Sequence, residues 1–102
     1  MDPSLPVWIA TVGQPTAGDA AVVLCTRDRP DMLATALAGL VPASAGAEVI
    51  VVDSASVTSA TRLAAEGAGV RYVRSEVPGL SRARNLGLHS TERAFVVFTD
   101  DD

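Results

Sequence analysis

The stretch Glu48-Val49-Ile50-Val51-Val52-Asp53 holds four consecutive β-branched apolar residues between two carboxylates. Such side chains favour strands, and a short continuous apolar run is typical of a strand that is buried on both faces. Strands of this kind occur in parallel sheets that helices cover on both sides. We therefore expect a buried strand over residues 48–53, and this strand decides the class of fold.

Similar apolar runs lie on both sides of this strand along the chain. One precedes it at residues 21–25, and two follow it at residues 70–73 and 95–98. Each run is short and is bounded by Gly, Pro or polar residues, which indicates a strand rather than a long helix. The sequence therefore predicts four strands.

Helical patterns separate these runs. The first predicted helix begins near Pro30 and ends where Pro42 and Gly46 follow its apolar face. The second is rich in Ala and is closed by Gly67, and the third covers residues 80–88. Each helix lies between two predicted strands, as in βαβ units.

Strands that alternate with helices at this spacing predict an α/β fold with a mostly parallel sheet and helices on both faces. Residues 1–20 hold three Pro and two Gly around one short apolar patch, so we interpret them as a leader or linker. The domain is therefore expected over residues 21–102.

Composition limits the classes of function. The 102 residues carry a net charge of −4, which gives no electrostatic basis for binding nucleic acid or an anionic membrane surface. The single Cys25 excludes an internal disulfide and fits a reducing compartment. No stretch reaches the roughly 20 apolar residues of a membrane span. A cytoplasmic location is expected, and membrane association would need parts of a longer chain.

Polar residues follow three of the predicted strands directly. Thr26-Arg27-Asp28 follows the first strand, Asp53-Ser54 the second, and Asp100-Asp101-Asp102 the fourth. Because the carboxyl ends of parallel strands lie at one edge of a sheet, where α/β proteins bind ligands, these groups should converge there. The sequence therefore predicts one ligand site at this edge.

The three consecutive acids point to a cation. Two carboxylates about 4 Å apart repel each other by roughly 4 kcal/mol at an effective dielectric constant near 20. Carboxylate oxygens suit Mg2+ or Mn2+, which keep positions open for water and for substrate phosphates. The run therefore suggests metal-dependent handling of a phosphorylated ligand, and the alternative is an acidic, frayed terminus.

Other candidate site residues also have both a functional and a purely structural interpretation. Asp53 could accept a hydrogen bond from a nucleobase or ribose, or it could cap the next helix. Thr26 could contact a base or simply end a strand. The segment Gly79-Leu80-Ser81-Arg82-Ala83-Arg84-Asn85 places two Arg at the start of a helix, where the dipole favours anions. A pyrophosphate or an acidic neighbour would explain these Arg residues, and solvent exposure is the alternative.

Four of these motifs, in this order and spacing, resemble the N-terminal half of family 2 glycosyltransferases. They are Val22-Val23-Leu24-Cys25-Thr26-Arg27-Asp28-Arg29-Pro30, Ile50-Val51-Val52-Asp53-Ser54-Ala55-Ser56, Pro78-Gly79-Leu80-Ser81-Arg82-Ala83-Arg84-Asn85 and Phe98-Thr99-Asp100-Asp101-Asp102. The resemblance implies a GT-A fold, a nucleotide-sugar donor and a divalent metal, Mg2+ or Mn2+. Ser54, Val57 and Thr58 depart from the residues usual in the second motif.

The resemblance also implies roles for residues at the predicted edge. Thr26, with Arg27 beside it, and Asp53 would hold the nucleoside of the donor. Arg84 and Asn85 would lie near the same donor pocket.

The last of these implied roles belong to the three consecutive acids. Asp100 and Asp102, with Asp101 between them, form the Asp-x-Asp motif. This motif would contact the ribose, with Asp100 and Asp101 on the donor, and would bind the metal through Asp100 and Asp102.

The resemblance ends at the Asp-x-Asp motif. Family members continue with strands that carry the acceptor site and the catalytic base, so we assign no catalytic residue among the 102. We interpret the chain as the donor half of an inverting, metal-dependent glycosyltransferase that transfers a sugar to an acceptor hydroxyl and is inactive alone. The alternatives are a non-catalytic nucleotide-binding or interaction module and, disfavoured by the absence of a Gly-rich basic loop after the first strand, a nucleotidyltransferase.

Overall fold

The computed structural model describes residues 16–101. A short 3-10 turn, η1 (Ala17–Asp19), precedes alternating strands and helices. These are β1 (Ala20–Thr26), α2 (Pro30–Ala43), β2 (Glu48–Ser54), α3 (Ala60–Gly67), β3 (Arg71–Ser75), α4 (Leu80–His89) and β4 (Phe95–Thr99). Within the predicted leader, the described residues are Thr16, which precedes η1, then η1 itself and the first residue of β1. Residues 1–15 lie outside the described part.

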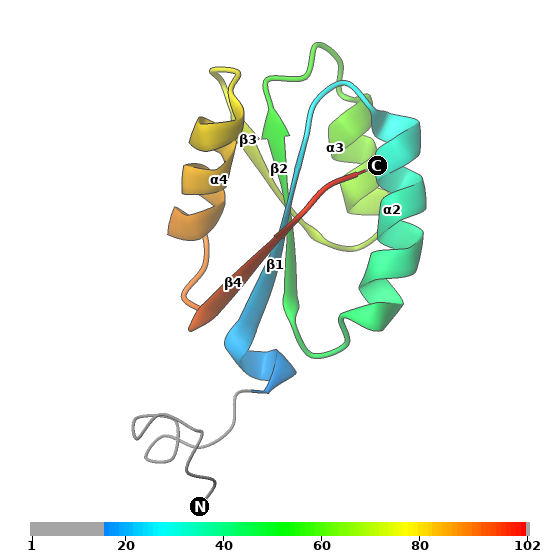
Figure 1. The fold of residues 1–102 in the computed structure, drawn as a ribbon. Coiled ribbons are helices and arrows are strands. Elements are labelled where there is room, and N and C mark those ends of the chain that lie inside the picture. Colours follow the sequence, from blue (N-terminus) through cyan, green and yellow to red (C-terminus); the bar gives the residue numbers. More distant parts are fainter. Residues whose placement is uncertain (1–15, 102) are drawn as a thin grey trace, which may run out of the picture.

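The strands form one parallel sheet in the order β3-β2-β1-β4. Helix α4 covers one face of the sheet, and α2 and α3 cover the other (Figure 1). The predicted α/β class, with a parallel sheet between two helical layers, is confirmed.

Alternating residues of the central strands build a core on each face. Towards α2 and α3, the buried residues Leu24 and Val51 pack with Leu33, Leu37 and Ala65. Towards α4, the buried residues are Val23, Ile50, Val52 and Ala83. Because β1 and β2 are apolar on both sides, the sheet must lie between two helical layers, as their continuous apolar runs indicated.

Helix α4 lies unusually close to the sheet at Gly87. A Cβ atom at this position would lie 2.5 Å from Cγ1 of Val23, so only glycine allows the contact. Ala83, one turn earlier, is also buried. The face of α4 that is formed by these small residues therefore packs on the sheet, and the start of the helix lies at the carboxyl edge.

Two helix ends differ from the sequence prediction. Pro42 lies inside the last turn of α2, because the helix ends one residue later and the Ser44 N–H closes the turn on the Val41 carbonyl. Gly67 is the last residue of α3 rather than its stop signal. The left-handed conformation that ends this segment falls on Gly69, whose φ is 73°.

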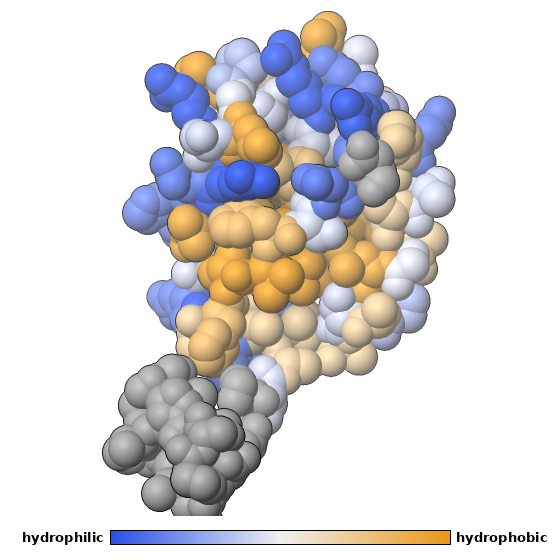
Figure 2. Space-filling view, in the orientation of Figure 1, coloured by the Kyte–Doolittle hydropathy of each residue, from blue (hydrophilic) through white to orange (hydrophobic). Residues whose placement is uncertain are grey.

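Strand β4 is one of the two edge strands of the described sheet and pairs with β1. Its side chains Phe95, Val97 and Phe98 are 44%, 53% and 37% exposed. Figure 2, in the orientation of Figure 1, shows an apolar surface in the middle of the view, where β4 runs. Within residues 16–101, no helix combines the length and apolar character needed to cross a membrane.

Candidate functional site

A hollow of about 450 Å3 opens at the carboxyl edge of the sheet, between the ends of β1 and β2, the start of α4 and the acids after β4. Its lining residues are Cys25, Thr26, Arg27, Arg29, Ser54, Gly79, Leu80, Ala83, Asp100 and Asp101. The predicted convergence of the first, second and fourth strand ends is therefore confirmed for the described residues.

A buried carboxylate joins β4 to β1 at this hollow. The Thr26 hydroxyl donates a hydrogen bond of 2.5 Å to Oδ2 of Asp101. Nη1 of Arg29 lies 3.5 Å from the other carboxylate oxygen of Asp101. Asp101 is only 8% exposed, whereas Asp100 beside it is exposed. Neighbouring acids in the run therefore have different environments.

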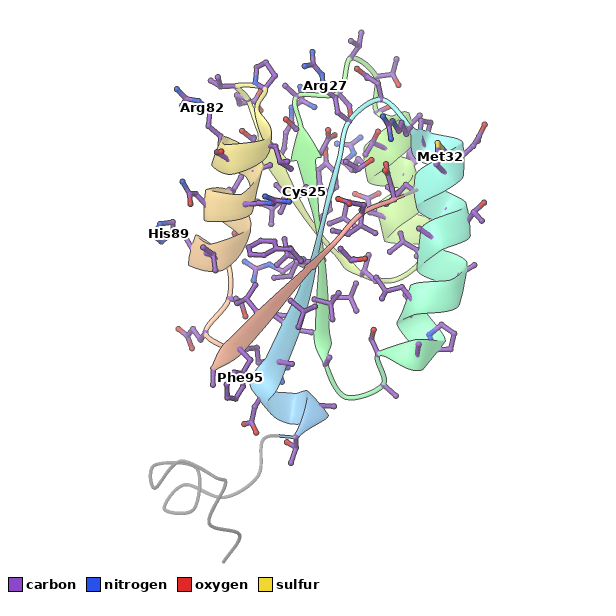
Figure 3. The ribbon with its side chains drawn as sticks, in the orientation of Figure 1. Cys25, Arg27, Met32, Arg82, His89 and Phe95 are labelled. Carbon is purple, nitrogen blue, oxygen red and sulfur yellow. The ribbon has the colours of Figure 1, made fainter. Side chains whose placement is uncertain are left out.

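The loop after β1 is tied to the loop after β2 through Asp28. The Asp28 N–H donates to Oγ of Ser56 at 2.8 Å, and the Val57 N–H donates to Oδ1 of Asp28 at 2.8 Å. Asp28 has a φ of 52°, a left-handed conformation that Asp tolerates better than most residues. These bonds fix the wall from which Arg27 and Arg29 extend; Figure 3 shows Arg27 at this edge.

Asp53 is fully buried and satisfied by groups of this chain. Its Oδ1 accepts from the Ser56 N–H at 2.9 Å. Its Oδ2 accepts from the Tyr72 hydroxyl at 2.6 Å and from Nη1 of Arg74 at 3.4 Å. It does not cap α3, whose N-cap is Ser59. Asp53 therefore stabilises the turn after β2 and the pairing of β2 with β3.

Asp53 and Ser54 point to opposite sides of the sheet because side chains alternate along a strand. Asp53 is two residues after Val51, so it points to the same face of the sheet, towards α2 and α3. Asp53 does not line the hollow. Ser54 lines it, and its hydroxyl oxygen accepts a hydrogen bond of 3.1 Å from the Gly79 N–H. The second strand thus contributes to the hollow through Ser54.

The start of α4 forms another wall of the hollow through Gly79, Leu80 and Ala83. Gly79 is the N-cap residue, with a φ of 141°, and no side chain caps the helix. The N–H groups of a first helical turn lack partners within the helix, and they favour an anion. This wall is therefore suited to a phosphate group.

Cys25 lines the hollow from β1, on the face of the sheet that α4 covers (Figure 3). Burial raises the pKa of its thiol; the Arg84 guanidinium opposes this effect and Asp100 adds to it. The thiol therefore stays protonated at neutral pH, and Cys25 acts as a small, weakly polar surface.

Two predicted site residues of α4 lie beside the hollow rather than in its lining. The Arg84 guanidinium carbon lies 5.7 Å from the centre of the Phe98 ring, in a cation–π contact. Asn85 is exposed. Arg82, one of the basic residues of this segment, points away from the sheet in Figure 3. His89 is the last residue of the helix and is exposed.

The structure therefore brings Thr26, Arg27, Asp100 and Asp101 to one hollow. It places Asp53, Arg84 and Asn85 outside the lining, and Asp102 lies outside the described residues. Six lining residues were not among the site residues to which the sequence analysis gave individual roles; they are Cys25, Arg29, Ser54, Gly79, Leu80 and Ala83. Each lies within one of the four quoted motifs, and Ser54 was expected at this edge, so membership of a motif is the signal that could have found them.

The donor set suits a metal that is shared with a ligand. Among residues 16–101, no three His, Cys, Asp or Glu side chains gather closely enough to hold a metal ion by themselves. Asp100 is an exposed carboxylate at the hollow. Mg2+ or Mn2+ is often held by one or two carboxylates, with phosphate oxygens and water completing the coordination. The residues present fit such an ion.

Comparison with known proteins identifies the family. The sequence model of glycosyl transferase family 2 matches residues 21–102. The chain belongs to glycosyl transferase family 2. The fold agrees, since solved glycosyltransferase structures share it, and the described sheet and helices match part of the GT-A fold. No curated protein matches the chain.

Several solved structures resemble this family 2 chain. Glucosyl-3-phosphoglycerate synthase from Mycobacterium tuberculosis, in complex with Mn2+, UDP and glucosyl-3-phosphoglycerate, matches all of it with a TM-score of 0.73 and 24% identity. The same enzyme with Mn2+, UDP and phosphoglyceric acid matches 88% of it, with a TM-score of 0.72 and 25% identity. A mycobacterial protein matches 88% with a TM-score of 0.72 and 27% identity. The chain spans only 36–39% of these three proteins.

Proposed function

We propose that this chain is the donor-binding half of an inverting, metal-dependent glycosyltransferase. The full reaction transfers a sugar from a nucleoside diphosphate to an acceptor hydroxyl. The observation that carries the proposal is the shared hollow, to which three family motifs contribute Thr26, Arg27, Gly79 and Asp100. In an α/β sheet this edge is where nucleotides bind.

The nucleoside contacts the walls formed by the ends of β1 and β2. Thr26 and Arg27 line the hollow, and Asp53 lies behind it, where it fixes the turn after β2. Asp53 acts on the nucleoside indirectly, by fixing that turn. Alternatively, it binds the nucleoside directly when Tyr72 or Arg74 no longer donates a hydrogen bond to its carboxylate. Arg84 and Asn85 lie beside the hollow on α4, within reach of an extended donor.

The diphosphate lies between a cation and the start of α4. Asp100 and Asp102 hold Mn2+ or Mg2+, and Asp100 and Asp101 border the ribose. When bound, the cation neutralises charge on the leaving diphosphate. Arg27, Arg29 and the uncapped first turn of α4 add positive potential around the same phosphates. The solved relatives with Mn2+ and UDP support this choice of metal and nucleotide.

Catalysis requires groups outside residues 21–102. An inverting transfer needs a base within hydrogen-bonding reach of the acceptor hydroxyl, and we place this base and the acceptor site elsewhere in the natural protein. The acceptor is undefined by the described residues. A cytoplasmic location, which the lone Cys25 favours, is part of the proposal.

Calorimetric titration of UDP in the presence of Mn2+ tests the proposal. The protein is expressed at its full natural length, unaltered and with Asp100→Asn and Asp102→Asn combined. We expect this double variant to lose about tenfold or more in affinity, which corresponds to roughly 1.4 kcal/mol. Unchanged affinity would contradict the metal site.

The matched control removes two negative charges elsewhere. Glu66→Gln combined with Glu92→Gln changes exposed acids on α3 and in the loop between α4 and β4, neither of which lines the hollow, and should leave the affinity within about twofold, because exposed charges away from the site are screened by salt. Sugar transfer measured as UDP release separates the enzyme from a non-catalytic module. A module would bind Mn2+ and UDP without turning over any donor.

A further inference from the structure

The middle acid of the run after β4 is in a different environment from the acid before it. Asp101 is 8% exposed, whereas Asp100 is exposed to solvent at the hollow. A buried carboxylate is costly unless it is hydrogen-bonded, so its partners indicate its role.

Both oxygens of Asp101 have partners on the β1–α2 segment. Thr26, 75 residues away in sequence, donates to Oδ2 at 2.5 Å. Arg29, 72 residues away, pairs with Oδ1 at 3.5 Å. Thr26 ends β1, and Arg29 is the N-cap residue of α2. Asp101 therefore joins the end of β4 to both sides of the loop that carries Arg27.

This tie also orients the neighbouring acid. Asp101 is held inward by two charge-assisted hydrogen bonds, while Asp100, the residue before it, is exposed and lines the hollow. Thr26 uses its only hydroxyl proton on Asp101, so towards a ligand its side-chain oxygen can act only as an acceptor.

We propose that Asp101 is a positioning residue, which fixes the acid run against the β1–α2 loop and is not itself a ligand of the metal. Its carboxylate aims Asp100 at the donor and holds Thr26 and Arg29 in the wall of the hollow. This inference rests on the proposed function, because the donor and its metal are what the positioned groups bind.

The test compares Asp101→Ala with Asp101→Asn in the protein of full natural length. Asn keeps an oxygen for Arg29, and its amide can donate to the Thr26 oxygen, so the tie persists without the charge. We expect Asp101→Asn to bind Mn2+ and UDP within about threefold of the unaltered protein, and Asp101→Ala to lose about tenfold or more. Titration calorimetry gives both values.

A matched control separates positioning from general destabilisation. Leu40→Ala shortens a partly buried side chain of α2 that packs on the core, away from the hollow. Leu40→Ala should lower the midpoint of thermal unfolding and leave the affinity for Mn2+ and UDP within about twofold. The reason is that a change in the core away from the hollow shares no contacts with the groups that bind the ligand. Asp101→Ala should lose affinity at temperatures where it is fully folded.

The outcomes distinguish the two proposals. If Asp101→Asn loses as much affinity as Asp101→Ala, the carboxylate is a ligand and this inference is overturned. Unchanged affinity in Asp101→Ala would overturn it as well, while the proposed function stands. If the unaltered protein binds no UDP with Mn2+, the proposed function fails and this inference fails with it.

Discussion

The Tyr72 hydroxyl donates a hydrogen bond of 2.6 Å to Oδ2 of Asp53 and thereby joins β3 to β2 at the edge that carries the hollow. Asp53 is fully buried, so every donor around it offsets part of the cost of removing a carboxylate from water. Arg74 and the Ser56 N–H are its other partners. The Tyr72–Asp53 pair is therefore expected to contribute to stability.

Replacing Tyr72 with Phe should lower the free energy of unfolding by about 1–3 kcal/mol, because a buried acceptor loses a donor while the ring is kept. Urea unfolding of the protein at its full natural length measures this change. The control is Ser75→Ala, which removes a hydroxyl that donates to the Val77 carbonyl on an exposed turn and should cost less than about 0.5 kcal/mol. Equal effects in the two variants would argue against the role given to Tyr72.

The same pair predicts a pH dependence. Burial, and then the hydrogen bond to Asp53, raise the pKa of Tyr72 above its ordinary value of 10.0. The folded state therefore holds the phenolic proton more tightly than the unfolded state. The stability that Tyr72 contributes is fully present below its unfolded pKa and is lost as the pH rises through the folded pKa. The difference in unfolding free energy between the unaltered protein and Tyr72→Phe should be constant up to about pH 9 and shrink above about pH 10. A difference that shrinks below neutral pH would contradict this.

Gly87→Ala should destabilise the protein, because its Cβ would lie 2.5 Å from Val23 and force α4 away from the sheet. A cost of about 1–3 kcal/mol is expected for such overpacking. Gly39→Ala in α2 is the matched control, since nothing lies within 4 Å of its Cβ and alanine favours a helix. It should be neutral or stabilising by up to about 1 kcal/mol. Thermal unfolding compares them, and a neutral Gly87→Ala would mean that α4 does not lie this close to the sheet.

Displacing α4 should also weaken nucleotide binding. Gly79 and Leu80 line the hollow at the start of the same helix. Gly87→Ala is therefore expected to reduce the affinity for UDP with Mn2+, while Gly39→Ala should not.

The sequence was sufficient to predict the parallel sheet and the edge where the site lies. Continuous apolar runs such as residues 48–53 require cover on both faces, and parallel strands bring their carboxyl ends together. The strand order was not needed for either step. This is why Thr26 and Asp100 could be placed at one site without knowing which strands pair.

The orientation of individual side chains could not be predicted in the same way. Whether Asp53 or Ser54 faces the hollow depends on the parity of β2, and a shift of one residue exchanges the faces. Tyr72 could be recognised as a partner of Asp53 only once β3 was known to pair with β2. Likewise, the contact of Gly87 with Val23 sets the rotation of α4, and this rotation places Arg84 over Phe98.

Cys25 provides a chemical probe of the hollow. It lines the cavity and is partly buried, and its pKa is raised by burial. Iodoacetamide should therefore modify it slowly at neutral pH and faster as the pH rises above the usual range of a thiol, because the thiolate is the nucleophile. UDP with Mn2+ should slow the reaction further by covering the thiol. Mass spectrometry of the Cys25 peptide measures both effects, with Mn2+ alone as the control; modification at the same rate with and without UDP would place the nucleotide elsewhere.

The edge strand β4 should make the isolated 102-residue chain self-associate. Its backbone is paired on one side within the described sheet, and Val97 is 53% exposed. Open apolar edges of this kind pair with other chains. Val97→Lys should shift the isolated chain towards monomer in size-exclusion chromatography with light scattering, because a charge on the edge opposes strand pairing. Val57→Lys is the matched control: Val57 is 84% exposed but lies in the loop after β2, so this variant should associate like the unaltered chain. An unaltered chain that is a monodisperse monomer and melts cooperatively would show that β4 needs no further cover.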